Sequence, residues 1–135
     1  MIKIKVLNGG NEKSCPPATQ DVNLNLKNRQ EAINDQDYGP ANPDEPNEEF
    51  WNEKAKEWKT NIKQAKTMRC GNCNVFNMTK KMKDCIEKGM SDGQQSKADD
   101  YDAAVKDLGY CEMLKFKCAA SRTCDAWVQG GPIKD

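Results

Sequence analysis

The chain has 135 residues, 36% of them hydrophobic and 31% charged, which is the length of one small domain with less apolar surface for a core than an average globular chain has. Lysine plus arginine and aspartate plus glutamate both number 21, so no net charge favours binding to nucleic acid or to an anionic membrane. Histidine is absent, which excludes a histidine general base and every mixed Cys/His zinc site.

The first predicted elements are short. Residues 2–6 alternate polar and apolar side chains before an Asn-Gly-Gly turn signal, which predicts a strand. Asp21 can cap a helix whose apolar residues share one face, and this helix is expected to end near Gly39. Residues 38–46 are rich in proline and glycine, so we expect an ordered connector there.

The strongest helical pattern covers residues 47–68, where apolar side chains recur at close to the helical period. We expect a single amphipathic helix with Phe50, Trp51 and Trp58 as anchors on or beside its apolar stripe, because large aromatic side chains dominate buried contacts. Two interpretations of the stripe stay open: it packs on the cysteine-rich domain, or it docks on neighbouring subunits.

The C-terminal half predicts two more helices and a strand. Thr79 can cap a helix that Gly89 ends, and residues 97–109 form a second helix that Gly109 stops. A short strand and a turn-rich tail follow. The expected fold class is therefore small α+β, mostly helical and irregular, with an N-terminal strand and amphipathic helical arm over residues 1–69 and a metal-stapled, cysteine-rich domain over residues 70–135.

Seven cysteines carry the most specific chemical signal. No segment is apolar enough for a membrane span, and the N-terminal residues are too polar for a signal-peptide core, so we expect a chain that is not secreted and whose thiols stay reduced. Cys70 and Cys73 form a CxxC pair. Four interpretations of the cysteines stay open: a zinc site, an iron–sulfur cluster, a disulfide framework, or burial as small core side chains. Cys15, held extended by Pro16 and Pro17, is expected to lie outside any metal site.

The stretches "CGNCNVF", "GYC" and "CDAW" resemble the cysteine pattern of high-potential iron–sulfur proteins. The resemblance covers roughly the last half of the chain and implies a four-iron, four-sulfur (4Fe-4S) cluster, with zinc as the alternative metal. The implied ligands are Cys70, Cys73, Cys111 and Cys124, and the implied aromatic shield is Phe76, Tyr110 and Trp127. Cys85 and Cys118 fall outside this set and could be additional ligands, a disulfide pair of their own, or buried thiols.

A second resemblance covers more of the chain. "CPPATQDVNLNLKNRQEAI", "YGPANPDEPNEEFW" and "LGYCEMLKFKCAASRTCDAWVQGGPI" are similar to small cysteine-rich proteins that marine tailed phages, including cyanophages, encode and carry in their virions. This resemblance implies a structural component that is assembled in the host cytoplasm and contacts capsid or tail proteins in a symmetric particle. The balanced charge of the chain favours neither a nucleic-acid nor a membrane partner.

Catalytic signals are weak. The glycine pairs in "LNGGN" and "VQGGPI" do not have the spacing of a nucleotide-binding loop, and the chain contains no recognisable acid–base pair. We therefore expect a protein that is not an enzyme. Two classes of function remain from the sequence: a structural or interaction protein stabilised by its cluster or zinc, and an electron-transfer protein.

Overall fold

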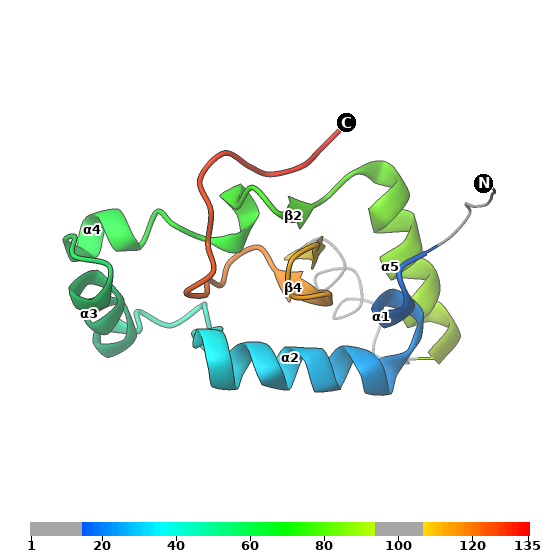
Figure 1. The fold of residues 1–135 in the computed structure, drawn as a ribbon, viewed down its shortest axis with the longest axis horizontal. Coiled ribbons are helices and arrows are strands. Elements are labelled where there is room, and N and C mark those ends of the chain that lie inside the picture. The colour runs from blue at the N-terminus through cyan, green and yellow to red at the C-terminus, as the bar shows by residue number, and fades with distance from the viewer. Residues whose placement is uncertain (1–14, 94–106) are drawn as a thin grey trace.

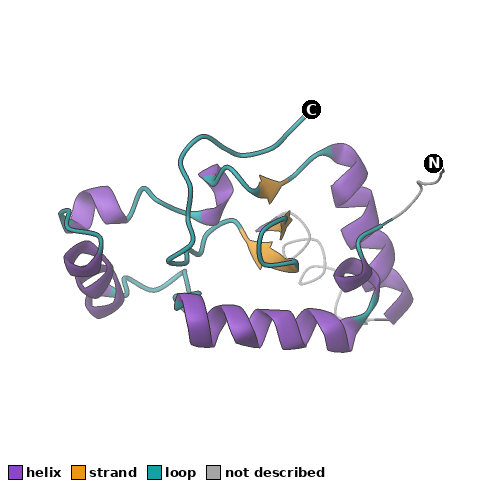
Figure 2. Cartoon of the chain, in the orientation of Figure 1, coloured by secondary structure: helices purple, strands orange, loops and turns teal. Residues whose placement is uncertain are grey.

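The computed structural model describes residues 15–93 and 107–135, and within them the chain forms a small α+β fold with a three-stranded antiparallel sheet. Helices α3 and α4 lie at one end of the molecule and α1 and α5 at the other, with the sheet between them and α2 running alongside (Figure 1). Helices and loops account for most of the fold (Figure 2). The predicted strand at residues 2–6 and most of the predicted helix at 97–109 lie outside the described residues.

The first two helices are α1, Pro17–Gln20, and α2, Val22–Gln36. Asp21 caps α2 as predicted, because its carboxylate accepts a hydrogen bond from the backbone N–H of Leu24 at 3.1 Å. The helix ends at Gln36, and its C-terminal cap is Asp37, which lies two residues before Gly39 and adopts a left-handed conformation with φ 54°. Helix α2 packs against strand β4, Phe116–Ala119, so it belongs to the same body as the cysteine-rich half.

The single helix predicted for residues 47–68 is wrong. The segment forms α3, Glu48–Glu57, and α4, Ile62–Ala65. Between them Lys59 has a φ of 58°, and Asn61 caps α4 by accepting the N–H of Gln64 at 2.7 Å.

The chain reversal lets the apolar stripe bury itself. Trp51, Ala55 and Ala65 form a compact core between the two helices, and the half-buried Phe50 and Trp58 pack against it. The predicted anchors therefore pack on their own segment within this chain.

The sheet has the order β2-β3-β4, with β2 at Phe76–Asn77 and β3 at Leu108–Cys111. Cys111 lies opposite both Phe76 and Phe116, and Gly109 lies opposite Cys118. The prediction that a helix ends at Gly109 is wrong, since this glycine is a strand residue. A Cβ there would lie 2.3 Å from the Phe76 ring, so glycine is needed for the ring to cover the strand.

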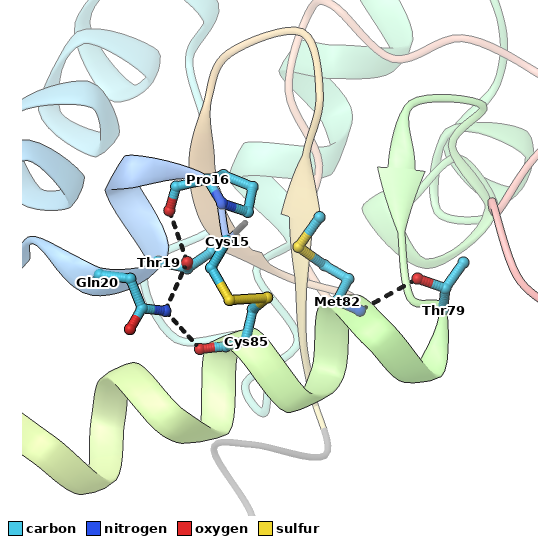
Figure 3. The surroundings of a disulfide bond; sticks show 7 residues. All are labelled: Cys15, Pro16, Thr19, Gln20, Thr79, Met82 and Cys85. Atoms are coloured by element: carbon cyan, nitrogen blue, oxygen red, sulfur yellow. Dashed lines mark hydrogen bonds between the residues drawn. A yellow bond between two sulfur atoms is a disulfide. The ribbon is translucent and has the colours of Figure 1, made fainter. Parts of the chain in front are cut away.

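Helix α5, Lys80–Gly93, begins as predicted, with the Thr79 hydroxyl accepting the N–H of Met82 at 3.2 Å (Figure 3). It does not end at Gly89 as predicted. A Cβ on Gly89 would lie 1.8 Å from the carbonyl oxygen of Thr19, so this glycine lets α1 and α5 approach each other closely.

We predict that Gly89→Ala destabilises the fold by about 2–3 kcal/mol, because the new methyl group forces α1 away from α5. Helix propensity alone predicts the opposite sign, a gain of up to about 1 kcal/mol for an interior glycine-to-alanine change. Urea unfolding of the two proteins measures the difference. A stabilised variant would show that the close contact does not exist.

A disulfide joins Cys15, just before α1, to Cys85 in α5 (Figure 3). The same junction is supported by the side-chain amide of Gln20, which donates to the carbonyl of Cys85 at 2.8 Å. Cys15 therefore lies away from the other thiols, and Cys85 pairs with it instead of with Cys118 or a metal. The general expectation of reduced thiols does not hold for this pair, and no pattern in the sequence predicted that Cys15 pairs with Cys85.

Two cores lie on opposite faces of the sheet. One gathers Cys85, Ile86 and Met82 of α5 with Ala18 and Tyr110. The other contains the remaining cysteines together with residues from α2 and the loop after it, among them Ala32 and Tyr38. Each of these two cores contains residues from both sides of the predicted boundary between residues 69 and 70, so the boundary does not divide them. Among the described residues, no helix has the length and apolar character to cross a bilayer.

Candidate metal centre

Five reduced, buried thiols gather around one small cavity of about 10 Å³ (the thiol pocket), so they are packed close to one another. They come from four segments: Cys70 and Cys73 from a short 3-10 turn and its end, Cys111 from β3, Cys118 from β4, and Cys124 from the C-terminal segment. The structure thus brings together all four cysteines that the resemblance implied as ligands, and it adds Cys118.

The CxxC turn is held against the segment that follows β4. The 3-10 turn spans Cys70–Asn72, and the N–H of Cys73 donates to the carbonyl of Cys70 at 2.9 Å. The N–H of Cys70 donates to the backbone carbonyl of Arg122 at 2.7 Å, and the N–H of Gly71 donates to the backbone carbonyl of Ala120 at 2.9 Å. These backbone bonds fix the two thiols relative to β4 without using any side chain.

Cys124 is positioned by the loop after α2. Its neighbour Thr123 exchanges backbone hydrogen bonds with Gly39, and the N–H of Asp125 donates to the carbonyl of Gln36 at 2.7 Å. The end of α2 therefore sets the position of Cys124, which explains why residues far from the cysteine-rich half belong to this site.

Strand register decides which aromatic side chains surround the thiols. Phe76 and Trp127 line the thiol pocket as expected. Tyr110 does not, because neighbouring residues of a strand face opposite sides and Cys111 occupies the side of the thiols. Sequence reasoning missed Tyr38 and Phe116, whose rings pack edge to face at 4.9 Å in the same core, because no local pattern links them to the cysteines.

Backbone N–H groups point at two of the sulfur atoms. The Cys111 sulfur accepts the N–H of Leu114 at 3.2 Å, and the Cys73 sulfur accepts that of Val128 at 3.4 Å. Such hydrogen bonds stabilise negative charge on sulfur, which is the form in which cysteine binds metals.

The electrostatic environment favours the deprotonated, thiolate form of Cys111. A hydrogen bond from Cys118 is the main cause that lowers the pKa of Cys111 to about 7, against the effect of burial. Burial raises the pKa of Cys73, and it raises that of Cys124 to about 12. The pKa of Cys118 is also raised, mainly by burial and then by its hydrogen bonds to Cys111 and Cys70. A set of thiolates here requires a neutralising cation, since burial opposes uncompensated charge.

The spacing of the sulfurs bears on which cation fits. Among the described residues, the only three candidate ligand atoms that all lie within 4.8 Å of one another belong to Asp37, Glu57 and Asp125, so no three of the five sulfurs are that close. Four thiolates around one zinc ion are only about 3.8 Å apart, given a Zn–S distance of about 2.3 Å and tetrahedral geometry. A cuboidal iron–sulfur cluster binds each thiolate at a different iron and spaces the sulfurs more widely.

The acidic group at Asp37, Glu57 and Asp125 holds an ammonium ion of the chain itself. The Lys54 Nζ lies 2.7, 2.7 and 2.8 Å from these three carboxylates, and its side chain has no exposed surface. Burial lowers the pKa of Lys54, but the hydrogen bonds to Asp125, Asp37 and Glu57 outweigh it and raise the pKa above its usual value. Lys54 thus ties α3 to both the end of α2 and the loop that carries Cys124.

We predict that Lys54→Met destabilises the fold by about 3 kcal/mol. The change removes the shared cation and leaves three carboxylates facing one another, and breaking a buried ion pair costs about 3–5 kcal/mol, with the lower end expected here because the carboxylates reach solvent.

Lys66→Met is the matched control, since Lys66 pairs with Glu48 at the surface and exposed pairs contribute about 0–1 kcal/mol. Urea unfolding compares the two variants. Equal losses of stability would contradict the role given to Lys54.

Comparison with known proteins identified no relative: no protein-family model, no curated protein and no solved structure is significantly similar to this chain.

Proposed function

We propose that this chain is a non-enzymatic structural protein of a phage particle, in which a thiolate-bound 4Fe-4S cluster takes the place of a conventional hydrophobic core. The ligands in this proposal are Cys70, Cys73, Cys111 and Cys124. The observation that carries it is the convergence of five buried thiols from four segments on one small cavity, and the choice of an iron–sulfur cluster over zinc rests on the sequence resemblance.

The composition of the core supports a stabilising role for the metal. Five of the nine buried residues in this core are cysteines, with only Phe76, Phe116, Tyr38 and Ala32 beside them. Cysteine side chains are small, so a core built from them buries little apolar area per residue. A cluster bound by four thiolates would link the CxxC turn, β3 and the C-terminal segment, and its binding free energy would become folding free energy.

The cluster's contribution in this proposal is to bind four thiolates at once and to balance their negative charge. The chain's own residues control access of water and position the sulfur atoms. Phe76 and Trp127 limit access of water to the thiol pocket, and the N–H groups of Leu114 and Val128 hold the Cys111 and Cys73 sulfurs in position.

The metal is tested by purifying the full chain anaerobically from cells supplied with iron and zinc. We expect iron and acid-labile sulfide in equal amounts, about four of each per chain, with visible absorption. Zinc without iron and without colour would show that the alternative, a zinc-stapled domain, is correct. Metal-free protein with free thiols would contradict both.

The assignment to a particle rests on the sequence resemblance. The structure adds exposed apolar side chains for contacts, and two of them, Met78 and Ile133, are adjacent through a hydrogen bond from the Met78 N–H to the Ile133 carbonyl at 2.8 Å. Quantitative mass spectrometry of washed, density-purified particles is expected to find this chain in fixed ratio to the capsid or tail proteins. Its presence only in the lysate of infected cells would contradict the proposal.

Electron transfer is the second candidate. The backbone N–H groups directed at Cys73 and Cys111 and the aromatic side chains of Phe76 and Trp127 favour it, because hydrogen bonds to sulfur and exclusion of solvent help to set the potential of an iron–sulfur cluster. Reversible one-electron voltammetry of the iron-loaded protein, together with its absence from particles, would favour the electron carrier over the structural protein.

A further inference from the structure

A second, open pocket of about 390 Å³ lies beside the thiol pocket, between α4 and the C-terminal segment (the amide pocket). The side chain of Trp127 lines both pockets. Small-molecule sites typically have volumes of about 300–1,000 Å³, so the amide pocket has room for a ligand of one or two rings. None of the features described above explains it.

One wall of the amide pocket is bare backbone. Gly130 has a φ of 119°, which side chains rarely adopt, and a Cβ on Gly131 would lie 1.8 Å from the carbonyl oxygen of Cys73. Both positions therefore require glycine, and the C-terminal segment packs directly on the CxxC turn. The glycine pair of "VQGGPI" leaves an opening in the surface where side chains would otherwise stand.

The residues lining the amide pocket are polar and uncharged, apart from Met68 and the Trp127 ring. Gln64 and Gln129 are both exposed and line this pocket, and their side-chain amides make no hydrogen bond within residues 15–93 and 107–135. Each amide offers both donors and an acceptor. The Thr67 hydroxyl, which donates to the Gln64 carbonyl at 2.6 Å, still has acceptor capacity.

The Trp127 ring is fixed in place. Its indole N–H donates to the carbonyl of Arg69 at 2.8 Å and to the side-chain oxygen of Asn72 at 2.9 Å. The Asn72 amide is itself held by the carbonyl of Thr67 at 2.7 Å. A ligand thus meets a rigid aromatic side chain, which lowers the entropy cost of binding.

We propose that the amide pocket binds a neutral pyranose unit of a glycan. Sugar hydroxyls both donate and accept hydrogen bonds, which matches the free amides of Gln64 and Gln129. The apolar C–H face of a pyranose ring packs on an aromatic ring such as Trp127. The absence of charged side chains from the lining disfavours acidic and amino sugars, whose charges would lose hydration without gaining a partner. This proposal goes beyond the proposed function and does not depend on the metal.

Titration calorimetry and saturation-transfer NMR of the full-length protein, with its metal as purified, test the proposal. The probes are methyl α-glucopyranoside, methyl β-galactopyranoside and N-acetylglucosamine, with glucuronate, glucosamine and a capped dipeptide as comparison ligands. We expect saturable binding of at least one neutral pyranose. The double variant Gln64→Ala/Gln129→Ala is expected to weaken it about tenfold, because each lost hydrogen bond contributes roughly 0.5–1.5 kcal/mol.

Gln30→Ala is the matched control, because Gln30 is exposed on α2 and does not line the pocket. It is expected to leave the affinity unchanged. Three results would overturn the proposal: no saturable binding of any neutral pyranose, equal affinity in the double variant and the wild type, or preferential binding of a charged sugar or the dipeptide.

Discussion

Replacing Cys70, Cys73, Cys111 or Cys124 with serine is expected to abolish iron binding and to unfold the part of the chain around the thiol pocket. Each variant removes one thiolate from a set that holds separate segments together. Metal binding contributes on the order of 10 kcal/mol in small structural metal sites, which exceeds the whole stability of many domains. Iron content and thermal unfolding of each purified variant measure the effect.

Cys118→Ala is the matched control for the ligand variants. Cys118 lies in the same pocket and is as deeply buried as the others, but it lies outside the four-ligand set. We expect this variant to keep its full iron content and to lose only the stability of a small buried side chain, roughly 1 kcal/mol. Loss of iron in Cys118→Ala with full iron in one of the four serine variants would show that Cys118 replaces that ligand.

Removing the disulfide is expected to cost about 4 kcal/mol while leaving the metal in place. Cys15 and Cys85 are separated by 70 positions, and closing a loop of this length lowers the entropy of the unfolded chain by an amount worth about 4 kcal/mol in the chain-entropy account. The double variant Cys15→Ala/Cys85→Ala can be compared with the wild type by urea unfolding, with iron content measured on the same samples.

The wild type treated with a mild reductant provides the control, since it removes the cross-link without changing the side chains. It is expected to lose about the same stability as the double variant. A double variant that is as stable as the untreated protein would contradict the cross-link between Cys15, just before α1, and Cys85 in α5. A double variant that loses iron would show that the disulfide and the thiol pocket are coupled.

Local chemistry in the sequence identified much of the fold. The Asp21 cap of α2 and the Thr79 cap of α5 were predictable because a capping side chain acts within three residues of itself. The turn between α3 and α4 was not predictable. Trp58 and Ile62 continue the helical spacing, and both pack on the core of Trp51 after the chain reverses, so the same pattern serves one long helix or two short ones.

Two glycines had a different role from the one their position suggested. Gly89 and Gly109 resembled helix ends, but each lies within an element and permits a close contact with a residue far away in sequence, Thr19 and Phe76 respectively. A glycine that ends a helix and a glycine that allows close packing look alike in a single sequence. Only the tertiary contact distinguishes them.

The site was predictable in part. The CxxC spacing brings Cys70 and Cys73 together through one local turn, and the resemblance added Cys111 and Cys124. The roles of Cys118 and Tyr110 depend on the pairing of β3 with β4, because a shift by one residue would exchange the faces of the strand. The partner of Cys85 could not be derived from spacing, because it depends on how α1 packs on α5.

Native mass spectrometry of the anaerobically purified chain tests the central claim most directly, because one intact mass reports the metal, the sulfide and the number of disulfides together. The account predicts the mass of a chain with one disulfide plus four irons and four sulfides, and its loss from the Cys73→Ser variant. A mass equal to the chain plus one zinc ion, or to a metal-free chain with further disulfides among the five thiols of the pocket, would contradict it.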